Sequence, residues 1–182
     1  MFEILTEFDF AVLNGIQDTV ACPFMDFLMK AVSFLGGAVI WTIIGAIMLF
    51  FKKQRINGIY VIAAVALSIL VGELLIKPLF MRERPFIVND FPIIITPPFG
   101  TSFPSTHTLI SFAAAAALFK YKKWAGLSGL GFAFLTGFSR LYLYVHFPTD
   151  VIAGAVIGAL LGVAVLVVGH LIKRLTERKK AT

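Results

Sequence analysis

The sequence predicts an all-α fold, a polytopic bundle of about five transmembrane helices with an N-terminal amphipathic helix in the membrane interface. Hydrophobic residues make up 59% of the 182 residues, and the mean hydropathy is +0.91. Soluble domains are usually only about 45–50% apolar. Several apolar runs approach or exceed the roughly 20 residues that a helix needs to cross a bilayer. Short clusters of Lys and Arg separate these runs.

The first 22 residues predict the interfacial helix. Phe8, Val12 and Ile16 recur at helical spacing, and acidic residues such as Asp9 lie between them. This pattern is amphipathic but too charged to cross a bilayer. The acids, and the lack of a basic start and a small-residue cleavage site, argue against a cleavable signal peptide. Pro23 is expected to end the helix.

The remaining apolar runs predict five spans within a single membrane-embedded domain that covers residues 1–182. Gly154, Gly158 and Gly162 repeat every four residues, which predicts a flat stripe for close helix packing in the last span. The spans are expected at about residues 25–51, 56–76, 104–120, 124–141 and 150–173.

The net charge of +6 could suggest nucleic-acid binding, but the distribution of the basic residues argues against it. A nucleic-acid face needs a contiguous basic surface, whereas most of the basic residues here flank the spans and mark the cytoplasmic side. Because the last of these clusters follows the fifth expected span, the C-terminus is expected in the cytoplasm. Cys22 is the only cysteine, so no intramolecular disulfide can form. The basic clusters are Lys52, Lys53 and Arg55; Lys120, Lys122 and Lys123; and Lys173, Arg174, Arg178, Lys179 and Lys180.

A long segment, residues 78–104, is predicted to form an outer loop beside the active site. It is rich in proline and phenylalanine. Loops of this length are usually functional or disordered, and the aromatic residues favour a location in the membrane interface. Arg82, in this segment, is interpreted as facing lipid headgroups. Tyr142 and Tyr144, at the outer end of the fourth expected span, are interpreted as part of an aromatic belt. The spacing of Glu73 and Lys77, one helical turn apart, also predicts an ion pair, with a contact between Glu73 and a neighbouring helix as the favoured alternative.

Three segments rich in ionisable residues fall on the outer side of this topology. His146 and Asp150 are four residues apart, so a helical turn places them on one face, where the carboxylate can fix the imidazole tautomer. Arg140 offers a planar fork of donors that suits a phosphate. Basic residues on the outer side oppose the positive-inside bias, which indicates an anionic ligand. The segments are Lys77 to Pro85, Pro104-Ser105-Thr106-His107, and Ser139 to Asp150.

Together the three segments resemble the signature of the type 2 phosphatidic acid phosphatase superfamily of membrane lipid phosphatases. That signature has Lys, six residues and Arg-Pro; then Pro-Ser-Gly-His; then Ser-Arg, five residues, His, three residues and Asp. Order and spacing match throughout, from the second expected span to the end of the chain. One position departs, because Thr106 stands where the family usually has Gly. Threonine keeps the backbone N–H but disfavours positive φ.

The resemblance implies a role for each residue of the three segments. His146 is the nucleophile that forms a phosphohistidine, and Asp150 orients it. His107 protonates the leaving group and then activates water. No acidic cluster of the metal-ligand type appears in the sequence, so neither a metal nor another cofactor is expected. The phosphate ligands are Lys77, Arg84 and Arg140, with Ser105, Thr106 and the N–H groups at the helix start.

The implied function is hydrolysis of a lipid phosphate or diphosphate at the extracytoplasmic face of a bacterial inner membrane. Undecaprenyl diphosphate fits an outward-facing site best. Phosphatidylglycerophosphate, phosphatidic acid and lipid A phosphate are alternatives within the same class. A vanadate-type haloperoxidase and a non-catalytic lipid-binding protein are alternatives from other classes. The expected partners are the lipid substrate and the surrounding membrane lipids, and the sequence does not predict an oligomeric state.

Overall fold

The computed structural model describes residues 2–181, and every regular element within them is a helix. Met1 and Thr182 lie outside the described residues, as do the side chains of residues 2–5, 180 and 181, including Lys180 of the third basic cluster. The all-α prediction is confirmed for the described residues. In chain order the elements are α1 (Phe2–Val20), α2 (Pro23–Leu35), α3 (Ala38–Phe50), α4 (Arg55–Ile69), a π-helix (Leu70–Ile76), α5 (Lys77–Phe80), α6 (Pro85–Val88), α7 (Thr106–Leu118), α8 (Lys123–Tyr142) and α9 (Pro148–Ala181).

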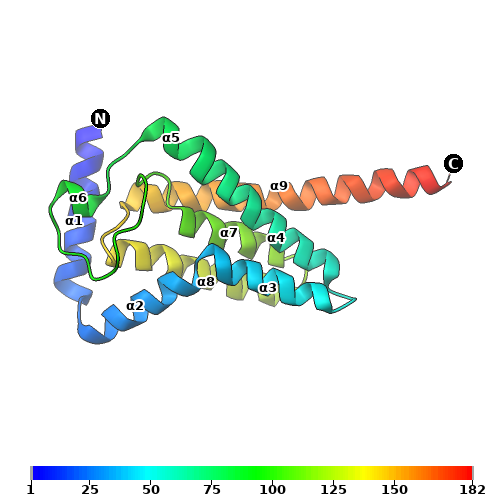
Figure 1. Ribbon diagram of the computed structural model, residues 1–182, viewed down its shortest axis with the longest axis horizontal. Coiled ribbons are helices and arrows are strands. Elements are labelled where there is room, and N and C mark those ends of the chain that lie inside the picture. The colour runs from blue at the N-terminus through cyan, green and yellow to red at the C-terminus, as the bar shows by residue number, and fades with distance from the viewer. Residues whose placement is uncertain (1, 182) are drawn as a thin grey trace.

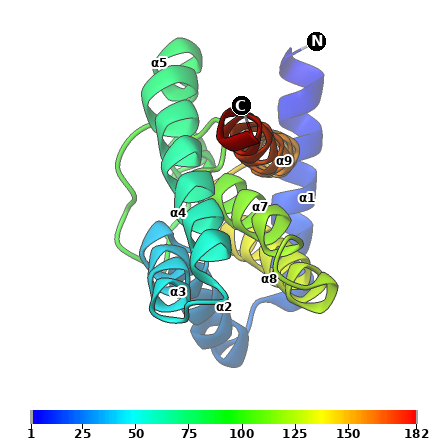
Figure 2. The ribbon, with the colours of Figure 1, turned by 90° about the vertical axis from the view of Figure 1, so that its right-hand side faces the viewer.

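Helix α7 is the centre of the bundle. The end-on view shows α4, α8 and α9 around it (Figure 2). Nearly all of its thirteen residues are buried, and Leu109, Ala113 and Ala117 have no exposed surface. The run of small alanine side chains lets neighbouring backbones approach closely.

The glycine stripe of α9 packs against α7, as predicted. A Cβ atom at Gly154 would lie 2.7 Å from the carbonyl oxygen of Ser105, which is shorter than any ordinary van der Waals contact. Cβ atoms at Gly158 and Gly162 would collide in the same way with the carbonyl oxygens of Leu109 and Ala113. Because α9 presents bare backbone here, it holds the start of α7 close to its own first turn.

The first predicted span consists of two helices, α2 and α3, with an angle of 52° between them. The bend lies at Gly36 and Gly37, between the end of α2 and the start of α3. Ser111 of α7 donates a 3.1 Å hydrogen bond to the carbonyl oxygen of Gly36 and accepts one of 3.0 Å from the indole N–H of Trp41. These bonds satisfy polar groups that the bend exposes and fix its position against α7.

Two helical stretches in the described chain are long and apolar enough to cross a membrane, Arg55–Val88 and Pro148–Lys179. The bent pair α2–α3 forms a third if its two helices make one span. Helix α7 has only thirteen residues, fewer than the roughly 20 of a complete span. The count of five spans therefore stays a prediction.

Helix α1 crosses the end of the bundle that carries the start of α9 (Figure 1). Leu13, which is fully buried, packs against Tyr144 and Phe147, and the ring of Phe10 meets Phe147 edge-on at 5.3 Å. The helix ends at Val20, before Pro23, as predicted. Its location in the membrane interface stays a prediction.

The aromatic-belt interpretation of Tyr142 and Tyr144 is wrong, because their side chains are buried, at 2% and 0% exposure. The Tyr142 hydroxyl donates to Asp26 of α2 at 2.6 Å, and the Tyr144 hydroxyl donates to Asn14 of α1 at 2.7 Å. Tyr144 also stacks on Phe91, with ring centroids 4.0 Å apart. A buried phenol needs such partners, and these two join α1 and α2 to the end of α8.

The segment 78–104 passes along the same end of the bundle as α1 (Figure 1). It is not wholly irregular, because it begins with the end of α5 and contains α6. Ser102 N–H donates a 2.7 Å bond to the carbonyl oxygen of Arg82, which brings the two ends of the segment together. Pro98 and Phe99, near its end, line the cavity described next.

Candidate active site

One end of the bundle gathers the three segments that the sequence singled out. Helix ends place most of the key residues. Lys77 opens α5, His107 lies in the first turn of α7, Arg140 in the last turn of α8, and Asp150 in the first turn of α9. His146 lies in the short connection between α8 and α9. The packing of the helices therefore brings together, at one end of the bundle, residues that are up to 73 positions apart in the sequence.

A cavity of about 90 Å³ lies at this convergence. Pockets that take drug-sized ligands are about 300–1,000 Å³, so this one suits a small polar group rather than a whole lipid. Six of the eight residues predicted for the site line it. They are Lys77, Arg84, Thr106, His107, Arg140 and His146, joined by Glu73, Pro98 and Phe99.

The two remaining predicted residues lie behind this lining. Asp150 is fully buried and its backbone carbonyl accepts a 3.1 Å bond from Ser105 N–H. The Ser105 hydroxyl is also fully buried, 3.0 Å from the Thr108 hydroxyl. Its predicted role as a direct phosphate ligand stays a prediction, and the observed contact is with the core of α7.

Arg84 is held rigidly by uncharged partners. Its guanidinium donates to the backbone carbonyls of Gly100 at 3.0 Å, Phe99 at 3.0 Å and Val145 at 2.9 Å. The side chain is 2% exposed. Because carbonyl oxygens carry only partial charge, its positive charge remains available to an anion in the cavity.

Arg140 is a second buried cation with spare donor capacity. It is 3% exposed, and one of its terminal nitrogens donates to the Ser33 hydroxyl. Its Nε has no hydrogen-bond partner among the described residues. A buried, unpaired donor is costly, and a phosphate oxygen in the cavity is a partner that would remove this cost.

His146 is fully enclosed beside these cations. Its Nε2 lies 3.2 Å from a terminal nitrogen of Arg84. A guanidinium can only donate, so Nε2 is the acceptor and Nδ1 carries the proton. Burial lowers the pKa of the imidazole to about 3, and the neighbouring Asp150 opposes this shift. The ring is therefore neutral near pH 7, with a lone pair on Nε2.

The other ring nitrogen faces the carboxylate. His146 Nδ1 lies 3.7 Å from Asp150 Oδ2, and the Ser102 hydroxyl lies 3.5 Å from the same nitrogen. Ser102 donates to Asp150 Oδ2, which also accepts the Phe147 N–H at 2.9 Å. This arrangement orients the ring and supports positive charge on it. Sequence reasoning missed Ser102, because nothing in its local pattern marks it.

Arg82 does not face lipid headgroups, so that interpretation is wrong. Its side chain is 25% exposed and forms ion pairs with Asp150 at 2.6 Å and with Asp9 at 2.7 Å. Sequence reasoning missed Asp9 as well. A signal was present, because Asp9 shares one helical face with Leu13 and Ile16, four and seven residues later.

Glu73 forms the expected ion pair with Lys77, at 2.7 Å. It also accepts a 2.6 Å bond from the Thr106 hydroxyl and lines the cavity. The lining thus combines three cations and one carboxylate. Within the described chain, no three His, Cys, Asp or Glu side chains are grouped as a metal ion would require.

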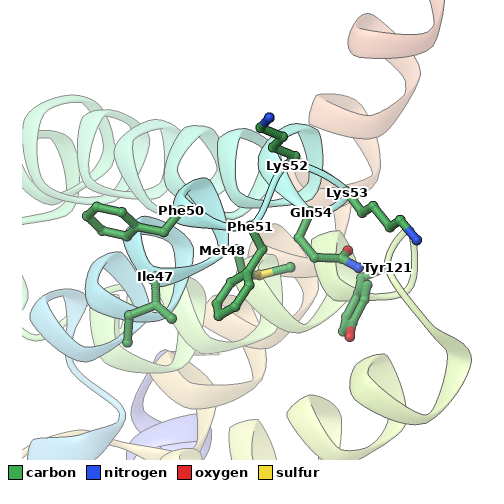
Figure 3. A pocket seen from close by; sticks show the side chains of 8 residues that line it. All are labelled: Ile47, Met48, Phe50, Phe51, Lys52, Lys53, Gln54 and Tyr121. Atoms are coloured by element: carbon green, nitrogen blue, oxygen red, sulfur yellow. The ribbon is translucent and has the colours of Figure 1, made fainter.

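A larger cavity, about 600 Å³, lies at the opposite end of the bundle, at the turn between α3 and α4 (Figure 3). Its lining is mainly apolar, with Met48 and Phe51 facing it, while the amines of Lys52 and Lys53 point away. It contains none of the residues predicted for the site. The candidate active site is therefore the smaller, charged cavity.

Comparison with known proteins supports the same conclusion. The sequence profile of the PAP2 superfamily matches residues 57–174. The chain is 34% identical over 161 residues to a protein of Sulfolobus acidocaldarius named undecaprenyl-diphosphatase, covering 87% of this chain and 72% of that protein. It is 31% identical over 197 residues to a protein of Bacteroides thetaiotaomicron named lipid A 4'-phosphatase, covering 98% of this chain and 83% of that protein.

The fold is shared with a solved structure. The crystal structure of a transmembrane PAP2-type phosphatidylglycerolphosphate phosphatase from Bacillus subtilis matches with a TM-score of 0.78 and 28% identity, over 94% of this chain and 89% of that one. The resemblance inferred from the three segments is therefore confirmed. The chain belongs to the PAP2 superfamily, and it is a membrane-embedded hydrolase of lipid phosphates.

Proposed function

We propose that the chain removes a phosphate from a lipid diphosphate, with undecaprenyl diphosphate as the best candidate, through a phosphohistidine at His146. The observation that carries this proposal is the position of His146 Nε2, which lies 3.2 Å from a terminal nitrogen of Arg84 in a cavity lined by three cations. Phosphoryl transfer depends mainly on positioning and charge stabilisation. The cavity supplies both.

The first step forms a nitrogen–phosphorus bond between Nε2 and the terminal phosphorus, while the bond from that phosphorus to the leaving oxygen breaks. The leaving oxygen keeps the electron pair and takes a proton from His107. Arg84, Arg140 and Lys77 stabilise the equatorial phosphate oxygens. The proton on Nδ1 stays in place, and Asp150 stabilises the positive charge of the phosphorylated ring.

The second step hydrolyses the phosphohistidine. His107, now neutral, takes a proton from a water molecule as that water attacks the phosphorus. The nitrogen–phosphorus bond breaks, its electron pair returns to Nε2, and inorganic phosphate leaves. The enzyme regains the neutral His146 and a protonated His107 for the next cycle.

Two observations support this substrate: the first fits any lipid with a terminal phosphate, and the second favours a lipid diphosphate among them. The cavity, at about 90 Å³, has room for a phosphate group but not for a bulky headgroup. The relative from Sulfolobus acidocaldarius, which aligns with 87% of this chain, is named undecaprenyl-diphosphatase. The lipid tail would then remain in the bilayer beside the bundle.

We further propose that the cavity faces away from the cytoplasm. The turns that carry Lys53 and Lys122, and the C-terminal part of α9, lie at the end of the bundle opposite to the cavity (Figure 1). Clusters of basic residues mark the cytoplasmic side of membrane proteins. The C-terminus is then cytoplasmic.

The test is phosphate release by the purified, detergent-solubilised chain in the presence of EDTA. Undecaprenyl diphosphate, phosphatidylglycerophosphate, phosphatidic acid and lipid A are compared as substrates. The matched control for His146→Ala is His170→Ala, an exposed histidine in the distal part of α9. Fastest release from undecaprenyl diphosphate, abolished only by His146→Ala, supports the proposal. A clear preference for another lipid, or turnover by the His146→Ala variant, contradicts it.

A further inference from the structure

A chain of charged groups runs from the active-site histidine to α1, the N-terminal helix. Asp150 uses Oδ2 toward His146 and the Ser102 hydroxyl, and its other oxygen, Oδ1, accepts a 2.6 Å bond from Arg82. The second terminal nitrogen of Arg82 donates a 2.7 Å bond to Asp9 of α1. Arg82 therefore bridges two carboxylates, of which only Asp150 belongs to the site already described.

Several hydrogen bonds hold the Asp9 carboxylate in this position. It is fully buried, and besides Arg82 it accepts the backbone N–H of Thr149 at 3.1 Å and the Thr149 hydroxyl at 2.7 Å. Thr149 lies in the first turn of α9, next to Asp150. A carboxylate at a helix start is favoured by the unpaired N–H groups and by the helix dipole. Asp9 thus caps α9 from another helix.

The position of Arg82 is equally constrained. Its guanidinium also donates to the Thr149 hydroxyl at 2.7 Å, and its central carbon lies 3.9 Å from the centre of the Phe147 ring. Phe147 in turn meets Phe10 of α1 edge-on at 5.3 Å. The guanidinium is consequently fixed between α1 and the α8–α9 connection, which contains His146.

The order of charges has an electrostatic consequence. If Arg82 paired with Asp150 alone, it would neutralise the carboxylate that supports positive charge on His146. Because Asp9 also binds Arg82, the three groups Asp9, Arg82 and Asp150 carry a net charge of about −1, and Asp150 keeps its effective charge toward the ring. A partly buried cation such as Arg82 is also better compensated between two carboxylates than beside a single one.

From this geometry we infer that Asp9 and Arg82 are positioning residues for the phosphoryl-transfer step. Helix α1 would then contribute to catalysis as well as packing against the end of the bundle. This inference rests on the proposed phosphohistidine chemistry. Neither residue lines the cavity, so their loss should slow turnover without weakening substrate binding. Outer partners that orient histidines in metal sites typically change activity by about 10- to 100-fold, and we expect Asp9→Asn to lower kcat within that range.

The variant series separates positioning from general stability. Asp9→Asn keeps the size of the side chain, removes its charge and replaces one of its two acceptor oxygens with an amide nitrogen that can only donate. Asp18→Asn is the matched control, since Asp18 is an exposed residue of the same helix. Tyr144→Phe removes the 2.7 Å bond to Asn14 of α1 and leaves the charged chain intact. Thermal unfolding of each variant in detergent measures how far the docking of α1 is weakened.

Two inhibitors provide a readout that a structural role would not change. Vanadate can take the five-coordinate geometry of a phosphoryl-transfer transition state, so under the proposed mechanism it would bond to His146 Nε2, whereas inorganic phosphate would rely on the cations of the cavity. We expect Asp9→Asn to weaken vanadate binding by about the same factor as kcat falls, with KM and phosphate inhibition changed by less than about twofold. The double variant Asp9→Asn with Arg82→Gln should lose no more than Arg82→Gln alone, because the two residues act as one unit.

The outcomes are distinct. The inference is overturned if Asp9→Asn turns over and binds vanadate as the unaltered chain does, or if Tyr144→Phe loses as much kcat at an equal loss of thermal stability. Vanadate binding, measured directly, needs no lipid turnover. If the unaltered chain hydrolyses no lipid tested but its vanadate affinity still depends on Asp9, the proposed substrate is wrong and the positioning role stands.

Discussion

The Thr106 hydroxyl donates a 2.6 Å hydrogen bond to Oε1 of Glu73, the same oxygen that the Lys77 amine contacts at 2.7 Å. Thr106 stands where the family pattern Pro-Ser-Gly-His has glycine, and this bond is a contact that glycine could not make. Thr106 begins α7 without backbone strain, because in the described chain the non-glycine residues with positive φ are Met81, Asp90 and Tyr144. The threonine therefore keeps its N–H at the helix start and adds a link to a carboxylate in the cavity.

Glu73→Gln should tighten the binding of inorganic phosphate. The carboxylate lies beside Lys77 and opposes an anion in the same cavity, while glutamine keeps an oxygen for the Thr106 hydroxyl. Two charges a few ångströms apart interact by about 4 kcal/mol at an effective dielectric constant of about 20, and each 1.4 kcal/mol is a factor of ten, so we expect the affinity to rise by at least about tenfold. The measurement is the phosphate inhibition constant. Glu83→Gln, an exposed residue of the neighbouring loop, is the control, and weaker phosphate inhibition in Glu73→Gln would contradict the assignment.

Arg84→Lys should lower kcat by about a hundredfold or more despite the retained charge. The guanidinium reaches three carbonyl oxygens and His146 at once, and a lysine amine cannot reproduce this planar fork. Loss of one preorganised donor to a developing charge typically costs about 10²–10³ in kcat. Steady-state phosphate release measures the effect. Arg55→Lys, which alters the first residue of α4 at the opposite end of the bundle, should retain full activity, and equal activity in both variants would refute the role of Arg84.

Gly158→Ala should destabilise the protein because the new methyl group would collide with the carbonyl oxygen of Leu109. Overpacking of this kind typically costs about 1–3 kcal/mol, and each kcal/mol lowers Tm by roughly 2–4 °C in a chain of this size. Thermal unfolding in detergent is the measurement. Gly131→Ala provides the control, since no atom lies within 4 Å of a Cβ placed there. An unchanged Tm in Gly158→Ala would mean that α7 and α9 are not in direct backbone contact.

The single cysteine offers a direct test of the orientation. Cys22 is exposed and lies between α1 and α2, at the same end of the bundle as the cavity (Figure 1). A membrane-impermeant maleimide should therefore label it in intact cells. The combined variant Cys22→Ser with Lys122→Cys, which moves the thiol to the opposite end, should be labelled only after the membrane is opened. The reverse pattern would place the cavity in the cytoplasm.

The spacing of the three segments predicted that their charged residues would lie together, and six of the eight predicted residues do line one cavity. Helix ends position most of these residues. A side chain at a given number of residues from the end of a helix points in a predictable direction. His146 and Asp150, for example, are separated by one turn around the start of α9. The glycine stripe of α9 was equally predictable, because a four-residue repeat marks one helical face.

The contacts of α1 were not predictable in the same way. The ion pair between Asp9 and Arg82 joins residues 73 positions apart, and a solvent-facing acid on an amphipathic helix has almost the same local pattern as a buried one. Tyr142 and Tyr144 were misread for the related reason that a tyrosine near a span end fits both an aromatic belt and a buried hydrogen bond. Tertiary packing alone decides between these alternatives.

The most direct test of the account is to trap the covalent intermediate. Undecaprenyl diphosphate labelled with ³²P in the terminal phosphate is mixed with the enzyme, and the reaction is quenched in base, in which phosphohistidine is stable. The account predicts acid-labile label on the peptide that contains His146, and none on the His146→Ala variant. Phosphate release by the unaltered enzyme with no label at His146, or with label on another residue, would contradict the assignment of His146 as the nucleophile.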